Sequence, residues 1–397
     1  MEVRSLSISS RRPYPTSSAV ACALFIPTGM ITVMLGPMLP ALSARWSLND
    51  TQSGYLITAQ FLGSLLGTVS SGFVASRFTF RSAMLLGVAL MAFGAATLVS
   101  HGYFWGAVAV FCSGTGIGIT VPTCNLVVAR TSGQERSSSL NLLNFFWSAG
   151  AVSCPFLLAV LPAGQRLGLL LAGLVGFLGL VALALLAAPI RMPESASSPE
   201  GAPQFRLQHV RTTVVLLFGT LFFVYVGTES ALGDWLASYA KRAAGEQGGG
   251  WVTVPAYFYG ALLVGRLVGS RSLKRIPDLA QARLGAVLAA GGVAALLYSG
   301  TLTGIAVAAT LVGLGMSTLY PIAIGLASAG LGTTAVRVMG TLFALSTLGG
   351  ACIPWLVGYV STRFGSLRVA LLVPLAGCAA IAVLFCNPLP EKCQSDS

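Results

Sequence analysis

Residues 114–122 (GTGIGITVP) reappear in altered form as residues 313–321 (GLGMSTLYP), with glycines and the proline in matching places. In the same register and without a gap, residues 150–155 (GAVSCP) fall on residues 349–354 (GGACIP). A match of glycines alone would mean little, but two matches in one register indicate that a structural unit occurs twice. We therefore predict a chain built from two related halves.

The composition excludes a water-soluble protein. Of the 397 residues, 55% are hydrophobic and only 9% are charged, whereas roughly 25% are charged in soluble domains. The mean hydropathy of +0.82 also excludes a disordered chain, which needs low hydrophobicity. Because a chain in lipid must satisfy its backbone hydrogen bonds internally, we predict an all-α membrane protein.

Twelve stretches are long enough to cross a bilayer, which takes about 20 apolar residues. The predicted spans cover residues 18–42, 51–76, 81–100, 103–129, 137–161, 166–188, 211–237, 251–272, 281–299, 301–328, 335–360 and 366–386. Four prolines and several serines in residues 189–210 predict a cytoplasmic linker. We thus predict six-helix bundles in residues 1–188 and 211–397, an architecture typical of transporters that rock one half against the other.

The basic residues predict how the chain lies in the membrane. With the N-terminus inside, the inner segments hold 17 of the 23 Lys and Arg residues, and the outer segments hold six. Cytoplasmic loops carry such an excess, so we expect both termini in the cytoplasm. The net charge of +12 then reflects orientation, and we expect no nucleic-acid partner.

Several classes of protein lack their characteristic residues here. The eight cysteines include no Cys-x-x-Cys pair, and both histidines fall in predicted loops. We therefore expect no metal, no disulfide framework and no cofactor. We expect no enzyme either, because neither a nucleophile with its base nor a phosphate-binding loop is recognisable. A channel would usually need an oligomeric pore, which the two-fold repeat disfavours.

Two acids lie inside a predicted span, whereas the other nine fall in predicted loops or tails. Ionisable groups in lipid cost about 2.5–3.5 kcal/mol and are functional candidates by default. Glu229 lies roughly 27 Å along the seventh span, in its outer half, and Asp234 lies near the outer mouth. Low dielectric disfavours a charged carboxyl, so we predict that these acids couple transport to an ion. Glu229 could instead be capped by Tyr225 or Thr228 and only hold the helix in place.

Polar and aromatic residues in the spans could bind a small polar solute. Tyr225 and Glu229 share a helix face at i, i+4 spacing, and Asn141, Asn144 and Ser148 share another. Amides can hydrogen-bond sugar hydroxyls, and aromatic rings can cover the apolar face of a sugar ring. Each amide could instead bridge two helices, for about 0.6 kcal/mol, and each aromatic could simply pack. The candidate substrate contacts are Gln60, Asn125, Asn141, Asn144, Trp147, Tyr225, Tyr257 and Tyr320.

Four prolines lie at equivalent places in the two halves. Pro122 matches Pro321, and Pro155 matches Pro354. Because proline removes a backbone hydrogen bond and bends a helix, we predict gating movements at these positions, although membrane helices also tolerate proline without such a role. Arg266, at the cytoplasmic side of the eighth span, could pair with helix ends when that side closes, or could only set the orientation.

The junction between the second and third spans carries a family signature. Residues 72–81 read GFVASRFTFR and resemble, in Gly72, Arg77 and Arg81, a cytoplasmic loop of the major facilitator superfamily. Ser76 stands where that family usually has Asp. Residues 60–67 (QFLGSLLG), 227–229 (GTE), 265–267 (GRL) and 348–355 (LGGACIPW) are similar to its fucose-permease-like sugar branch.

This resemblance implies twelve helices in two pseudo-symmetric bundles and transport by alternating access. It leads us to expect a secondary active transporter for a small polar solute, a sugar, driven by a proton or sodium gradient. It also implies a monomer in the inner membrane of a bacterium, with the solute and the bilayer as its partners. The acid expected in the first span of proton-coupled fucose carriers is absent from residues 19–42. The alternative is an efflux transporter of the same fold for lipophilic drugs or metabolites.

Overall fold

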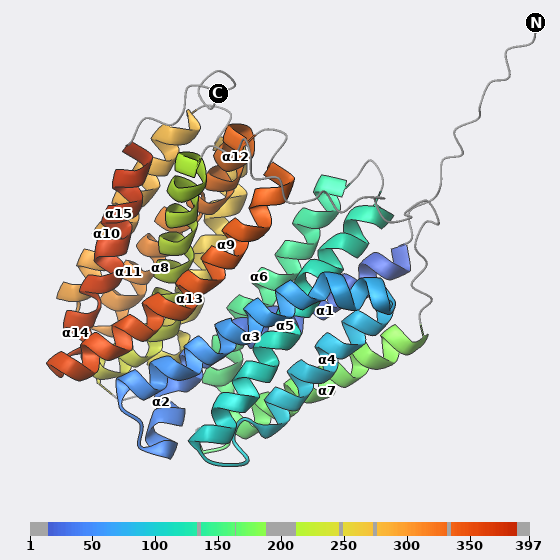
Figure 1. Cartoon of the computed structure of the whole chain (residues 1–397). Coiled ribbons are helices and arrows are strands. Elements are labelled where there is room, and N and C mark those ends of the chain that lie inside the picture. Colours follow the sequence, from blue (N-terminus) through green and yellow to red (C-terminus); the bar gives the residue numbers. More distant parts are fainter. Residues whose placement is uncertain are drawn as a thin grey trace, which may run out of the picture.

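The computed structural model describes residues 15–132, 136–162, 164–187, 212–245, 249–272, 276–331 and 335–386, and within these ranges the long elements are α-helices (Figure 1). The first group is α1 (Pro15–Val33), α2 (Leu35–Trp46), α3 (Asp50–Arg77), α4 (Phe80–Thr97), α5 (Tyr103–Thr131), α6 (Arg136–Val160) and α7 (Arg166–Ala187). The second is α8 (Thr212–Ala244), the 3-10 helix η2 (Gly250–Thr253), α9 (Val254–Ser272), α10 (Asp278–Tyr298), α11 (Leu302–Met316), α12 (Leu319–Leu331), α13 (Ala335–Phe364), α14 (Leu367–Ala370) and α15 (Leu372–Cys386). The predicted linker, residues 189–210, lies outside the described residues, so the domain boundaries stay predictions.

The apolar helices confirm the predicted fold class. Among the described residues, 11 spans are long and apolar enough to cross a membrane, and the bent pair α1–α2 makes up to 12. The predicted and observed ends agree closely except at α8, which continues beyond residue 237 to Ala244.

Two predicted spans are broken, each three or four residues before a proline. The first span bends by 45° between α1 and α2, where Pro37 has no N–H to donate to the carbonyl of Val33. The tenth span breaks between α11 and α12, where Pro321 cannot donate to the carbonyl of Ser317. The break at Pro321 agrees with the predicted bend, whereas the bend at Pro37 was not predicted because that proline has no counterpart in the repeat.

The repeated glycines make equivalent contacts in the two groups of helices. A Cβ atom on Gly150 of α6 would lie 2.0 Å from the carbonyl oxygen of Ile26, and one on Gly349 of α13 would lie 2.0 Å from that of Phe223. Such distances leave no room for a side chain, because helices in lipid pack closely through small residues. The sequence repeat therefore encodes the same helix crossing twice.

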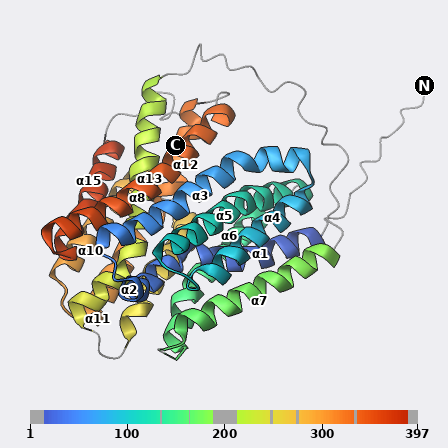
Figure 2. The same ribbon diagram turned by 60° about the horizontal axis from the view of Figure 1, so that its bottom comes forward.

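The two groups of helices meet along one part of their length. Figures 1 and 2 show α1–α7 gathered on one side and α8–α15 on the other. The groups touch where α3 packs on α13, α2 on α8 and α6 on α9. We call the helix ends near Pro15 and Cys386 the terminal side, and the ends near Trp46 and Ala244 the distal side.

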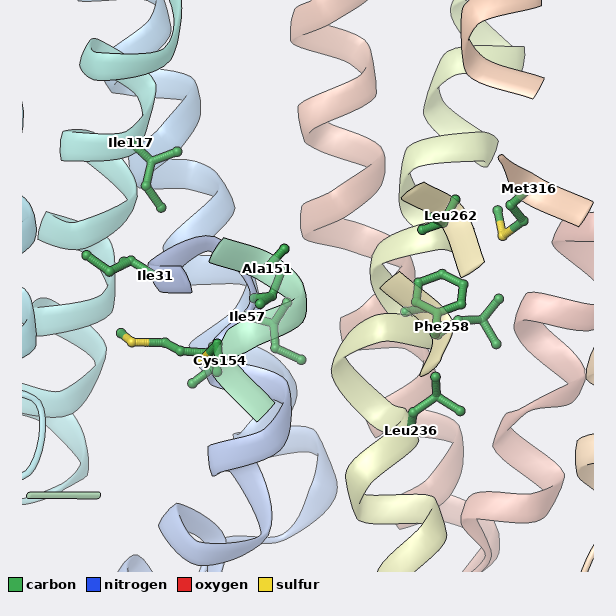
Figure 3. Packing of buried hydrophobic residues seen from close by; sticks show 14 of the residues in the cluster. Ile31, Ile57, Ile117, Ala151, Cys154, Leu236, Phe258, Leu262 and Met316 are labelled. Carbon is green, nitrogen blue, oxygen red and sulfur yellow. The ribbon is translucent and has the colours of Figure 1, made fainter. Parts of the chain in front are cut away.

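Each group has its own apolar core. Figure 3 shows Ile31, Ile57 and Cys154 in the first group and Phe258 and Leu262 in the second, and all five are buried. Four cysteines with free thiols, Cys22, Cys124, Cys154 and Cys378, lie buried in these cores. They act there as small packing residues, as the sequence predicts.

Candidate functional site

Glu229 faces a basic partner in the middle of the second group of helices. Its Oε1 atom lies 3.7 Å from Nη2 of Arg266, and the two side chains are 20% and 33% exposed. Arg266 belongs to α9 and lies three residues before the end of the span Gly250–Gly269, on the terminal side. Its predicted place at the cytoplasmic side of that span stays a prediction. Glu229 also lies near the midpoint of α8 rather than in the outer half, because α8 extends to Ala244.

Two tyrosines form a wall beside this ion pair. Tyr225 and Tyr320 stack with ring centroids 5.4 Å apart and an interplanar angle of 22°. The Tyr225 hydroxyl donates to the carbonyl of Met316 at 3.0 Å, which is at the break between α11 and α12. Both tyrosines lie near Glu229 and Arg266, so we group these four residues as the tyrosine–ion-pair cluster.

The ion pair of this cluster is open to a third group. A separation of 3.7 Å is too long for a hydrogen bond but leaves a strong attraction between the charges. The Nε atom of Arg266 is buried and has no hydrogen-bond partner among the described residues. A buried donor without a partner is costly, so this atom would gain a hydrogen bond if a rearrangement of the cluster exposed it to an acceptor.

The predicted amide contacts lie in the first group and do not join the cluster. Gln60 is buried, and its Nε2 atom donates to the carbonyls of Ile31 and Thr32 at 3.1 and 3.3 Å. Gln60 therefore bridges α3 and α1, which is the structural alternative stated for the amides. Asn125 and Asn144 donate to carbonyls within their own helices at 2.8 and 2.9 Å.

The remaining predicted substrate contacts, in α6 and α9, differ in how far their side chains are exposed. Asn141 and Asn144 are exposed, whereas Trp147 is half-buried where α6 crosses α1. Tyr257 is 44% exposed, and its ring contacts that of Phe156 in α6 at a centroid distance of 6.2 Å. Tyr257 thus belongs to the contact between the two groups rather than to the tyrosine–ion-pair cluster.

Three of the four prolines lie within unbroken helices. Pro122, Pro155 and Pro354 are inside α5, α6 and α13, and only Pro321 adjoins a break. The carbonyl of Pro354 accepts a hydrogen bond from Nε1 of Trp235 at 2.9 Å, which fixes α8 against α13. The gating role of these prolines stays a prediction.

The loop signature ends in a basic residue with a helix-end partner. Arg81 donates through Nη2 to the carbonyl of Leu186 in the last turn of α7, an arrangement that suits the negative end of a helix dipole. Arg77 is exposed, and a Cβ atom on Gly72 would have open space around it. The signature thus ties the α3–α4 junction to α7 through Arg81.

Asp234 is buried where α2 packs against α8, not at the outer mouth as predicted. Its side chain is on α8, and the residue is only 6% exposed. A Cβ atom on Gly36 of α2 would lie 2.8 Å from the Asp234 Cα atom. The bend at Pro37 swings α2 against α8, and this packing covers Asp234.

A hydrogen-bonded network closes the distal side. Asp50, predicted in a loop, is the first residue of α3, and its carboxylate accepts from Nη1 and Nη2 of Arg242 at 2.7 and 2.5 Å. Ser361 of α13 also donates to this carboxylate, at 2.5 Å. Nearby, the Thr51 N–H donates to the Thr362 hydroxyl at 2.9 Å. We call Asp50, Arg242 and Ser361 the distal latch, and spacing along the chain gives no hint of it.

Comparison with known proteins identifies relatives over nearly the whole chain. The family described as Major Facilitator Superfamily matches residues 21–351. A glucose/galactose transporter of Brucella abortus is 27% identical, over 94% of each chain. The L-fucose-proton symporter of Escherichia coli is 23% identical, over 94% of this chain and 93% of its own.

Solved structures share the fold. The Major Facilitator Superfamily transporter FucP, in an outward conformation, has a TM-score of 0.63 at 21% identity, over 93% of this chain and 97% of its own. A D-xylose-proton symporter has a TM-score of 0.75 at 12% identity, over 95% of this chain and 98% of its own.

Proposed function

Because this chain belongs to the Major Facilitator Superfamily, a family whose model matches residues 21–351, we propose that it is a secondary active sugar transporter. It carries its solute across the bilayer by exposing a site between the two groups of helices to one side at a time. The named activities of the relatives, glucose/galactose transport and fucose-proton symport, support this substrate class.

The observation that carries the proposal is the tyrosine–ion-pair cluster. A sugar hydroxyl can donate to the Glu229 carboxylate and accept from the partly exposed guanidinium of Arg266, bridging a pair that is 3.7 Å apart. Hydrogen bonds to charged groups are among the stronger ones. Tyr225 is buried at 2% exposure, whereas Tyr320, which stacks on it, is only partly buried. The ring of Tyr320 can therefore offer an apolar surface beside these polar atoms.

The contacts between the two groups support alternating access. Among the described residues, the hydrogen bonds that join the groups lie towards the distal ends of α3, α8 and α13 or, at Thr58 and Ala351, nearer their middles. Towards the terminal side, the Val69 and Phe73 side chains of α3 are 71% and 69% exposed. We propose that the terminal side is cytoplasmic, as the basic residues predict, so that this state opens inwards.

The protein is proposed to act as a monomer in a bacterial inner membrane and to draw on a proton or sodium gradient. The coupling groups are the two carboxyls of α8, Glu229 and Asp234. Imposing either a proton gradient or a sodium gradient across a vesicle shows which of the two ions drives transport.

Uptake into proteoliposomes tests the proposal. Labelled glucose, galactose and fucose are offered to the wild type and to Glu229→Gln under an imposed proton or sodium gradient. Wild-type vesicles should accumulate at least one of these sugars, and Glu229→Gln should lose uptake and counterflow because Arg266 loses its counter-charge. Asp278→Asn, on the terminal side at the start of α10, is the matched control. The proposal is wrong if wild-type vesicles move none of these sugars, or if Glu229→Gln performs as the wild type does.

A further inference from the structure

A cavity opens at the distal side between the two groups of helices. It has a volume of about 470 Å³ and is lined by Pro40 and Ser43 of α2, by Ser238, Lys241 and Arg242 of α8, and by Gly245. Two hydroxyls and two basic groups in this lining can hold water. The cavity therefore brings solvent into the contact between α2 and α8.

Both walls of this cavity lead to Asp234. On α8, Asp234 lies one turn before Ser238 and on the same face. On α2, Gly36 lies one turn before Pro40 and packs directly against the Asp234 backbone. Asp234 thus lies one helical turn deeper than the residues that line the cavity, and its close contact with Gly36 accompanies an exposure of only 6%.

The groups around Asp234 offer it no counter-charge. The Tyr259 hydroxyl of α9 lies near both Asp234 and Glu229, and beyond it lies the Cys154 thiol of α6. Glu229 is five residues earlier on α8, and α2 contributes Gly36, which has no side chain.

The nearest basic groups on α8 are about two turns away. Arg242 is bound by Asp50, and the Lys241 ammonium lies over the Trp251 ring, 5.5 Å from its centroid. Among the described residues, no ion pair involves Asp234.

We propose that Asp234 carries the coupling proton at the distal gate, being protonated when α2 closes against α8 and ionised when the two helices separate. This rests on the proposed transport function and names which of its two carboxyls takes up the proton. Burying an ionised carboxyl without a partner is costly, so the gate closes over the neutral form. Glu229 instead faces the Arg266 guanidinium at 3.7 Å, so its carboxyl remains available to the sugar.

The proton follows a short route through the protein. With the distal side open, the Asp234 carboxylate takes a proton from water in the cavity, and closure then seals the neutral acid from that water. With the terminal side open, Asp234 passes its proton to the Tyr259 hydroxyl, which lies near both Asp234 and Glu229, while that hydroxyl gives its own proton to water beside Glu229. The buried carboxylate that remains has no counter-charge, so it favours reopening of the gate. One proton thus enters with each closure, which describes symport.

Transport by Asp234→Asn tests the proposal. The amide is nearly the same size as the acid but is permanently neutral, so the gate can close without a proton. Wild-type vesicles should concentrate sugar under an inward proton gradient, whereas Asp234→Asn should equilibrate sugar and support counterflow without concentrating it. Asp278→Asn, the control, should concentrate sugar. The proposal is overturned if Asp234→Asn concentrates sugar as the wild type does, or if only a sodium gradient drives uptake. Absence of wild-type counterflow would instead reject the transport function.

Gate closure can be followed without any substrate. Cysteines replace Thr51 and Thr362, whose hydrogen bond joins the two groups at 2.9 Å, in a chain whose Cys352, Cys386 and Cys393 are replaced by serine. Because the thiolate is the reactive form, disulfide formation itself slows as the pH falls, so the rate in the protein that retains Asp234 is divided by the rate in Asp234→Asn at the same pH. This ratio should be low at high external pH and should rise towards one as the external pH falls, because protonation of Asp234 favours closure. A ratio that does not change with pH would overturn the proposal.

Discussion

At the scale of single residues, sequence reasoning identified the acids but not their partners. Glu229 was found because an acid in lipid is conspicuous, and the structure adds that Arg266 faces it at 3.7 Å. The sequence predicts helix ends or membrane orientation as the role of Arg266, because nothing in residue spacing shows that α9 packs this side chain against Glu229 of α8. The amides of Gln60, Asn125 and Asn144 were chosen by chemistry alone, and only packing decides whether they face a crevice or a neighbouring carbonyl.

The charge balance of the tyrosine–ion-pair cluster gives a prediction for Arg266. In Arg266→Gln, the Glu229 carboxylate loses its counter-charge and the solute loses a charged donor, so the KM for sugar should rise by about tenfold to a hundredfold. The double variant Glu229→Gln with Arg266→Gln should unfold at a higher temperature than either single variant, because removing both charges costs less than leaving one. Counterflow kinetics and thermal unfolding in detergent measure the two effects. If the double variant is less stable than both single variants, the two charges do not stabilise each other in the folded protein.

At the scale of helices, hydropathy predicted the existence and ends of the spans, and proline position determined their breaks. The bend between α1 and α2 was missed because Pro37 lies outside the repeated motifs, although proline at that position must free the Val33 carbonyl. The repeat was a better guide to packing, since glycines in matching register mark the same crossings in both groups. Local pattern thus predicts contacts within each half.

The glycine crossings should be sensitive to a single methyl group. Gly150→Ala and Gly349→Ala each place a Cβ atom 2.0 Å from a carbonyl oxygen, and overpacking of this kind costs about 1–3 kcal/mol. Both variants should therefore have lower unfolding temperatures than the wild type. Gly173→Ala in α7, where a Cβ atom would have no neighbour within 4 Å, is the control and should be neutral or slightly stabilising. Equal unfolding temperatures for all three variants would contradict the close crossings.

At the scale of the whole molecule, the two groups of helices have equivalent internal contacts, but the hydrogen bonds that join one group to the other lie mainly towards the distal side. The repeat constrains contacts within each half, but nothing in it specifies which ends of the halves touch, so the conformational state could not be predicted. The state is decided by residues outside the repeat. Asp50 and Arg242 lie far apart in sequence and meet only because α3 begins and α8 ends at the distal side.

The distal latch should therefore set the balance between inward-open and outward-open states. Arg242 is 48% exposed and Asp50 11%, so solvent weakens their attraction, and the pair is worth about 1 kcal/mol, or about a fivefold change in population. Asp50→Asn should shift the protein towards an open distal side and speed labelling of a cysteine placed at Thr58, whose hydroxyl donates to the Ala351 carbonyl across the halves. Exchanging the charges, with Asp50→Arg and Arg242→Asp together, should restore slow labelling, whereas Arg242→Asp alone should not. If Asp50→Asn is labelled as slowly as the wild type, the ion pair follows closure rather than favouring it, and closure must then depend on the packing of Gly36 against Asp234.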